Sequence, residues 1–155
     1  LDAEIASTIL GSGRSSVLYR SLVSEKRIAS TVGAFIDRRA HSSLLTMYAY
    51  ASEEETSAEI LVDAIYEAVR GLVLTEERRS AAVNRLKTNL AAELQKVNGV
   101  SDTVAWSTLF WNDPAYANTM LDRYTAIGME PVQKIIEQCA DPTRTVRLDV
   151  VPKSA

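Results

Sequence analysis

The sequence predicts an α+β domain in which an antiparallel or mixed sheet is covered by helices. Apolar residues alternate with a period of two over residues 28–36 and 44–51, and again over 144–151, which is typical of strands. Nearly all of the chain between residues 58 and 139 instead has helical spacing. Strands and helices that come in separate blocks indicate the α+β class. A chain of 155 residues, 46% of them hydrophobic, is long enough to form one domain with a core.

The composition excludes several classes of function. A formal net charge of −3 gives no general attraction to nucleic acid or to an anionic membrane. Cys139 is the only cysteine, so an internal disulfide is impossible. The chain begins with Leu1 rather than methionine, and we expect a single domain over residues 1–155 that is truncated at its N-terminus.

The chain is predicted to open with two short helices joined by a glycine turn. Gly11 and Gly13 can adopt the positive φ that ends a helix, and Ser15 or Ser16 can cap the next one. Apolar residues at helical spacing mark the buried face of the first helix: Ile5, Ala6, Ile9 and Leu10. The second helix would bury Leu18 and Leu22 and end at the charged residues 25–27.

Two adjacent antiparallel strands are expected next. Both faces of residues 28–36 are apolar or small, which favours a central strand. Residues 37–41 form a polar connection of hairpin length that contains His41. In the second strand, Leu45, Met47 and Ala49 share one face; the other carries Leu44, Thr46, Tyr48 and Tyr50.

The helical block follows from capping signals and periodicity. An amphipathic helix occupies residues 60–72, and Thr75 caps another whose apolar stripe reaches Val97. Asn98-Gly99 is predicted to end that helix and Ser101 to cap the next, which carries Trp106, Phe110 and Trp111. Those aromatic rings could cap a peptide groove or be buried in a core or interface. After a break at residues 112–114 come a helix over 116–124, a helix opened by Glu130-Pro131, and a last strand over 144–151 with Val146, Leu148 and Val150 facing inward.

Two blocks of the sequence resemble the C-terminal, non-zinc domain of the pitrilysin-like (M16) zinc metallopeptidases. The first is Gly13-Arg-Ser-Ser-Val-Leu-Tyr-Arg20, followed by Glu25-Lys-Arg-Ile-Ala-Ser-Thr-Val32. The second runs from Ile127 to Lys153 and keeps the spacing of the family's closing helix, Asp-Pro step and strand, although Gly128 and Pro131 depart from its phrase. The blocks lie in the right order at opposite ends, so the resemblance covers essentially the whole chain.

The resemblance implies a clam-shell zinc peptidase in which two halves close around an extended peptide. In that family the zinc and the general base are on a His-x-x-Glu-His helix of another domain, where two His one helical turn apart hold the metal. His41 is the single histidine here and is expected in an exposed loop, so this segment is predicted to have no metal site and no activity alone. Zinc would belong to the parent protein.

A second family feature is also missing. Domains of the opposite half carry an Arg and a Tyr that contact substrate and the reacting carbonyl; the corresponding positions here are Val23 and Ser30. Neither side chain could supply a cation and a phenol. The chain thus resembles the domain that accompanies the zinc-bearing one, while a partner half supplies Arg and Tyr.

The expected function is therefore that of an accessory domain of a zinc-dependent metalloendopeptidase, which shapes the peptide chamber and the interdomain interface. The alternative is a non-catalytic core-type or peptide-binding subunit of the same family. Expected partners are the zinc-bearing domain, a second M16-like half and the peptide, and single-half relatives suggest the bacterial periplasm or envelope. The motif residues are candidates for structural or interface roles: Gly11, Gly13, Arg14, Ser15, Leu18 and Tyr19.

Overall fold

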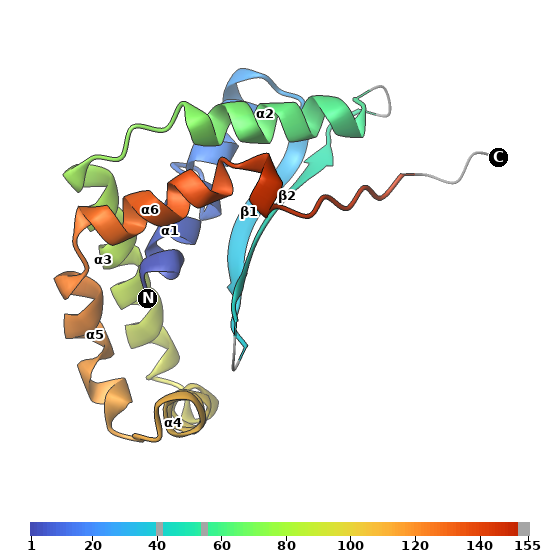
Figure 1. The fold of residues 1–155 in the computed structure, drawn as a ribbon. Helices are drawn as coiled ribbons and strands as arrows, with labels where there is room; N and C mark the ends of the chain where they lie inside the picture. Colours follow the sequence, from blue (N-terminus) through green and yellow to red (C-terminus); the bar gives the residue numbers. More distant parts are fainter. Residues whose placement is uncertain (40–41, 54–55, 152–155) are drawn as a thin grey trace.

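The computed structural model describes residues 1–39, 42–53 and 56–151, and it confirms the α+β class. The elements in chain order are α1 (Asp2–Gly11), the π-helix η1 (Tyr19–Glu25), β1 (Ala29–Asp37), β2 (Leu44–Ala51), α2 (Ala58–Arg70), α3 (Glu76–Glu93), α4 (Val97–Trp111), α5 (Tyr116–Ala126), α6 (Met129–Cys139) and the 3-10 turn η2 (Pro142–Arg144). Figure 1 shows the helices gathered on one side of a twisted hairpin, with α1 in the middle of the molecule. Among the described residues, no helix is both long and apolar enough to span a bilayer.

The core is built around α1. This helix packs on β1 from one side and on α3 and α6 from the other. Ile5, Ala6 and Leu10 have no exposed surface, so the predicted apolar stripe of this helix is confirmed. The inner face of α6, with Val132 and Ile136, closes the core from the other end of the chain. The first and last helical segments therefore stabilise one another.

The two strands form the expected antiparallel hairpin. Val32 lies opposite Ala49, Ala34 opposite Met47, and Ile36 opposite Leu45, and all of these residues except Ile36 pack against the core. The prediction that β1 is a central strand is wrong for the described residues, where the sheet contains β1 and β2 only. Because both faces of β1 carry apolar residues, we expected both faces to be buried, and a two-stranded hairpin alone does not bury both. His41, which we expected in the connecting loop, lies outside the described residues.

Two predicted helix caps differ from the structure. Ser16 does not cap the second helix through its side chain, because its Oγ donates to the Gly13 carbonyl, 2.7 Å away. Asn98-Gly99 does not end a helix; both residues lie inside α4, and the Ser101 Oγ donates back to the Val97 carbonyl. Gly99 has a packing role instead, since a Cβ there would lie 2.0 Å from the Glu93 carbonyl oxygen. The predicted cap at Thr75 is confirmed, and Ser57 caps α2 in the same way although we did not predict it.

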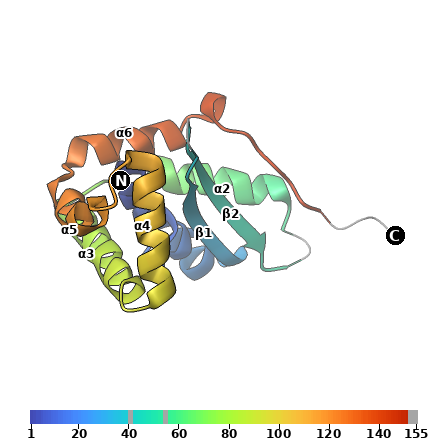
Figure 2. The same ribbon diagram turned by 90° about the horizontal axis from the view of Figure 1, so that it is seen from below.

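The prediction of a last strand over residues 144–151 is also wrong. Residues 145–151 form no strand in the described chain, and their apolar side chains are exposed rather than inward: Val146 97%, Leu148 85% and Val150 89%. This segment extends away from the helices (Figures 1 and 2). The alternation of Val, Leu and Val is typical of a strand, but among the described residues this segment pairs with neither strand of the hairpin.

Candidate interdomain surface

The Gly11–Tyr19 motif forms the junction between α1, the hairpin and α3. Gly11 is the last residue of α1, and a Cβ on it would lie 2.0 Å from the Ala34 backbone nitrogen in β1. Gly13 has φ +79°, the left-handed conformation that glycine adopts without strain. The Arg85 guanidinium of α3 fills the space beside Gly13 and donates to the Ser12 carbonyl, 3.0 Å away. Glycine is thus required at the two positions for different reasons, close backbone approach at Gly11 and a left-handed conformation at Gly13.

The remaining motif residues divide between the core and the surface. Leu18 is fully buried, which agrees with a structural role. Tyr19 is half-buried at the start of η1, while Arg14 and Ser15 are exposed on the turn. Arg14 forms no ion pair within the part of the chain that the structure describes. Arg14 and Ser15 are therefore the motif residues whose side chains can reach a neighbouring domain.

Val23 and Ser30 occupy ordinary structural positions. Val23 is partly buried against the core, and the Ser30 Oγ donates to the carbonyls of Tyr50 and Ala51 at 3.3 and 3.1 Å. A hydroxyl held by two strand carbonyls satisfies a hairpin end; it does not provide a phenol or a cation for an oxyanion. These contacts are consistent with a segment that stabilises structure.

The described residues do not fit a zinc ion. They contain no group of three or more His, Cys, Asp or Glu side chains with the arrangement of a metal site. Cys139 is buried on the inner face of α6, and burial raises the pKa of its thiol, which disfavours the thiolate that a metal needs. No step of a zinc reaction can be derived from this part of the protein.

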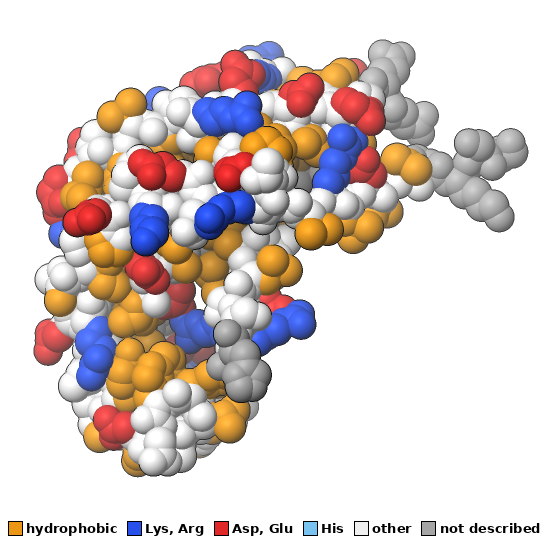
Figure 3. All heavy atoms as spheres, viewed as in Figure 1, with side chains coloured by type: hydrophobic (Ala, Val, Ile, Leu, Met, Phe, Trp, Pro, Cys, Tyr) orange, Lys and Arg blue, Asp and Glu red, His pale blue; other side chains and the backbone are white. Residues whose placement is uncertain are grey.

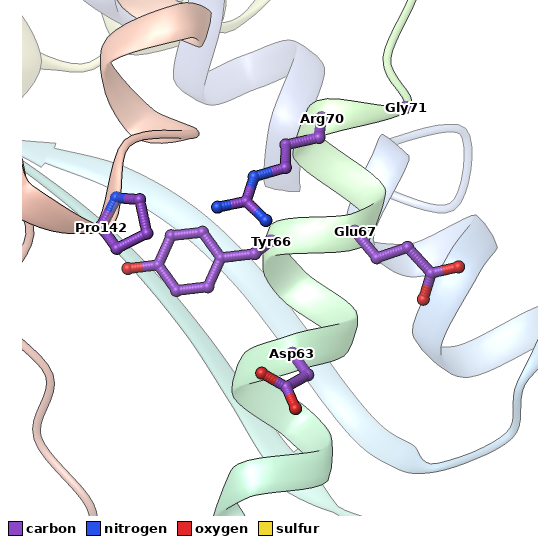
Figure 4. Close-up of a pocket in the computed structure, with 6 residues that line it drawn as sticks. All are labelled: Asp63, Tyr66, Glu67, Arg70, Gly71 and Pro142. Carbon is purple, nitrogen blue, oxygen red and sulfur yellow. The ribbon is translucent and has the colours of Figure 1, made fainter.

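A groove of about 790 Å³ lies between α2 and η2 (Figure 4), and three of its side chains, Tyr66, Glu67 and Arg70, already have partners within the chain. The Arg70 guanidinium carbon lies 5.4 Å from the centre of the Tyr66 ring, and Arg70 Nε donates to the Ala140 carbonyl. The Tyr66 hydroxyl is hydrogen-bonded to the Thr145 hydroxyl. The groove has no nucleophile beside a base, so we interpret it as the joint that attaches the C-terminal segment to α2.

A polar network ties α1 to the hairpin and to α5. The largely buried Glu4 carboxylate pairs with Arg38 and accepts from the Tyr124 hydroxyl at 2.8 Å. Burial raises the pKa of Tyr124, which keeps its hydroxyl protonated as the donor. Phe110 and Trp111 of α4 lie with Arg38 and Leu1 around a cavity of about 320 Å³ next to this network. The three groups satisfy one another, so their role is structural.

The face of the hairpin turned away from the core is aromatic. Phe35, Tyr48 and Tyr50 are all exposed on it, and their rings contact in sequence, with centroids 6.3 and 5.8 Å apart. The Tyr48 ring covers Gly33, where a Cβ would lie 2.5 Å from the tyrosine hydroxyl. The sequence analysis put Tyr48 and Tyr50 on the same face of the second strand, but it did not assign that face to the outside or identify it as a surface for a partner. Their alternation with Met47 and Ala49 was the sequence signal that could have identified this face.

The first 90 residues decide the family. They match the family model described as "Peptidase M16 inactive domain", which is more than half of the chain. The chain belongs to the M16 peptidase family. The resemblance inferred from the two sequence blocks is thereby confirmed, including the assignment to the domain that lacks the catalytic residues. No curated protein matches the chain.

Solved structures agree on the fold of this M16 domain. It is similar to the inactive peptidase domain of a proposed zinc protease from Bordetella parapertussis, with a TM-score of 0.84 and 17% identity, over 99% of this chain and 84% of that one. For a proposed zinc protease from Bordetella pertussis the TM-score is 0.72 and the identity 19%, over 87% of this chain and 75% of that one. For a protease from Helicobacter pylori they are 0.73 and 18%, over 88% of this chain and 33% of that one. The Helicobacter protease is thus about three times as long as the matched region.

Proposed function

We propose that this M16 inactive domain is the accessory domain of a zinc-dependent metalloendopeptidase, in which it shapes the peptide chamber and contacts the zinc-bearing domain. Zinc and the general base would belong to that other domain, and the substrate-contacting Arg and Tyr to a partner half. The aromatic outer face of the hairpin is the single observation that carries the proposal. Exposed aromatic rings of this density are typical of surfaces that bind protein or peptide.

The chemistry of this face suits an extended peptide or a domain surface. Phe35, Tyr48 and Tyr50 offer large apolar area, and the two hydroxyls can still donate to peptide carbonyls. The Gly11–Tyr19 junction supports the face from behind, because Gly11 lets α1 approach the β1 backbone. The rings are therefore presented by a packed element and need little reordering on binding.

A second candidate function comes from the same family. A non-catalytic core-type or peptide-binding subunit would use the same aromatic face without a zinc-bearing partner. Val23 and Ser30 favour this alternative and the accessory domain equally, since either would lack the Arg and Tyr. The two differ in whether the protein that contains this domain also contains His-x-x-Glu-His.

The decisive experiment is an activity assay of the full parent protein, alone and with a candidate partner half, on an unstructured peptide with and without a zinc chelator. We expect chelator-sensitive cleavage. Tyr50→Ala should lower kcat/KM about tenfold through KM, as expected for an interface aromatic. Val73→Ala, an exposed apolar residue between α2 and α3, is the matched control and should leave cleavage unchanged.

The outcomes separate the two functions. No zinc-dependent cleavage in any combination would contradict the peptidase role and favour the non-catalytic subunit. Cleavage that is insensitive to Tyr50→Ala would show that the hairpin face is not part of the chamber. The isolated 155-residue chain should bind no stoichiometric zinc by metal analysis after dialysis, and a tight site there would overturn the placement of the metal.

A further inference from the structure

A cavity of about 320 Å³ lies where the first turn of α1, the end of β1 and the end of α4 meet. Figure 1 shows the N-terminus, the end of β1 and α4 around this place, and Figure 3 shows hydrophobic side chains gathered at the same lower end of the molecule. The large apolar side chains that line the cavity include Ile36, Phe110 and Trp111. The proposed role of the outer face of the hairpin does not use these residues.

The side chain of Ile36 lines this cavity instead of packing in the core. Residues 32, 34 and 36 share the inner face of β1, because side chains alternate along a strand. Val32 and Ala34 pack against the core, whereas Ile36 does not and is half-buried beside the cavity. The cavity therefore leaves part of the inner sheet face without an apolar neighbour.

The aromatic side of the cavity is held in place by other rings. Trp111 stacks on Tyr116 of α5 with ring centroids 4.2 Å apart, and the Arg123 guanidinium carbon lies 4.2 Å from the centre of the Tyr116 ring. Phe110 stacks on Trp106 at 4.5 Å. Tyr116 is buried, but Trp111 keeps 40% of its surface exposed. Because these contacts fix the rings, a group that packs against them costs little side-chain entropy.

The charged side chains at the cavity already have partners. Arg38 pairs with Glu4, and Arg39 donates from Nε to the Asp37 carboxylate at 3.0 Å. The Asp2 carboxylate accepts from the next backbone N–H at 2.8 Å. A charged ligand would have to displace one of these partners or be desolvated without one, and either change is unfavourable. The balance of charge in the lining therefore favours an uncharged, apolar group.

We propose that this cavity is a subsite for one large, uncharged apolar side chain of an extended peptide, such as phenylalanine. The proposal rests on the proposed function, because it names the class of peptide that the domain would prefer. A volume of about 320 Å³ is at the lower end of the range for small-molecule sites, about 300–1,000 Å³, so the cavity suits one side chain and not a folded segment. Ser43 and Arg39 are exposed at the cavity and can hydrogen-bond to the peptide backbone beside the buried side chain.

This assignment gives Phe110 and Trp111 one of the two roles that the sequence left open, a wall of a peptide groove. Their neighbours Trp106 and Tyr116 have the other role, since they hold the two rings from behind. The site is separate from the outer face of the hairpin, because residues 35 and 36 lie on opposite faces of β1.

The test is the binding of acetyl-Gly-Gly-Phe-Gly-Gly-amide to the isotope-labelled 155-residue chain, followed by nuclear magnetic resonance. We expect the peptide, at high-micromolar to millimolar concentration, to shift the indole N–H of Trp111 and the backbone signals of Ile36 and Phe110. Peptides with alanine, lysine or glutamate in place of the phenylalanine should bind at least about tenfold more weakly, because they lose the burial of a large apolar side chain or add an unpaired charge.

Two variants with matched controls locate the site. Ser43→Trp adds a ring at the cavity and should block it, whereas Ser42→Trp adds the same ring at the neighbouring exposed position, which does not line the cavity. Trp111→Ala removes part of the aromatic wall, and Leu109→Ala removes an exposed side chain of α4 outside the cavity. We expect affinity to fall at least about tenfold in Ser43→Trp and Trp111→Ala and to change less than about twofold in the controls. Circular dichroism checks folding, and Ser43→Trp removes no packing contact, so it tests the site even if Trp111→Ala unfolds.

The outcomes separate this subsite from the proposed function. Absence of binding, equal affinity for the phenylalanine and glutamate peptides, or shifts confined to Phe35, Tyr48 and Tyr50 would each overturn the subsite. Any of these results would leave chelator-sensitive cleavage by the parent protein unaffected. A parent protein that cleaves nothing would contradict the peptidase role, while the expected shifts and preference would still support the subsite.

Discussion

Replacing Gly11 by alanine tests how closely α1 approaches the hairpin. The new Cβ would lie 2.0 Å from the Ala34 nitrogen and 2.4 Å from the Gly33 carbonyl carbon. Both are backbone atoms of a paired strand, so neither can rotate away, and either α1 or β1 must shift. Overpacking of this kind costs about 1–3 kcal/mol, offset by up to about 1 kcal/mol from alanine's higher helix propensity.

We therefore expect Gly11→Ala to lower the free energy of unfolding by about 2 kcal/mol, which corresponds to a fall in Tm of about 4–8 °C for a domain of this size. The assay is thermal and urea denaturation followed by circular dichroism. Gly128→Ala is the matched control, because a Cβ at Gly128 meets nothing within 4 Å. That variant should stay within about 0.5 kcal/mol of the wild type. Equal stabilities of the two variants would show that α1 does not touch the β1 backbone.

Two further predictions concern the core. Leu18→Ala removes a fully buried side chain of the family motif and should lower the free energy of unfolding by about 2–5 kcal/mol in urea denaturation. The control is Val73→Ala, which changes an exposed residue and should cost less than about 0.5 kcal/mol. Similar losses for both variants would contradict a structural role for Leu18. Cys139 should react with a thiol reagent far more slowly in the native chain than in urea. Because burial raises the pKa of the Cys139 thiol, this thiol loses its proton at lower pH in the unfolded chain than in the native one. The contribution of Cys139 to the free energy of unfolding should therefore fall as pH rises above about 9. If the free energies of unfolding of the wild type and Cys139→Ala differ by the same amount at every pH, this reasoning is refuted.

Local signals predicted most of the elements. The apolar stripe of α1, the alternation in the hairpin and the cap at Thr75 depend on residues within a few positions of one another, and all are present in the structure. The motif around Leu18 identified the family for the same reason, because its residues form one compact junction. Helix propensity, turn chemistry and periodicity act locally, so a sequence can be interpreted for them directly.

The α4 boundary shows where local signals fail. Asn98-Gly99 has the composition of a helix break, yet Gly99 lies within α4, where the Glu93 carbonyl comes too close for any side chain. That approach depends on where α3 ends relative to α4, and nothing within a few residues of Gly99 encodes it. The presence of a glycine is visible in the sequence, but its role, which is to allow the close approach of the Glu93 carbonyl, depends on the packing.

The surfaces were decided by the tertiary structure as well. By itself the sequence determined the family, the class of fold and the residues that alternate or recur along each element. It did not determine that Val97 and Leu109 of α4 lie exposed, that residues 146–150 do too, or that Phe35, Tyr48 and Tyr50 form one open aromatic face. An apolar period specifies which side chains share a face; which face is buried depends on the elements that pack against it, and those come from distant parts of the chain.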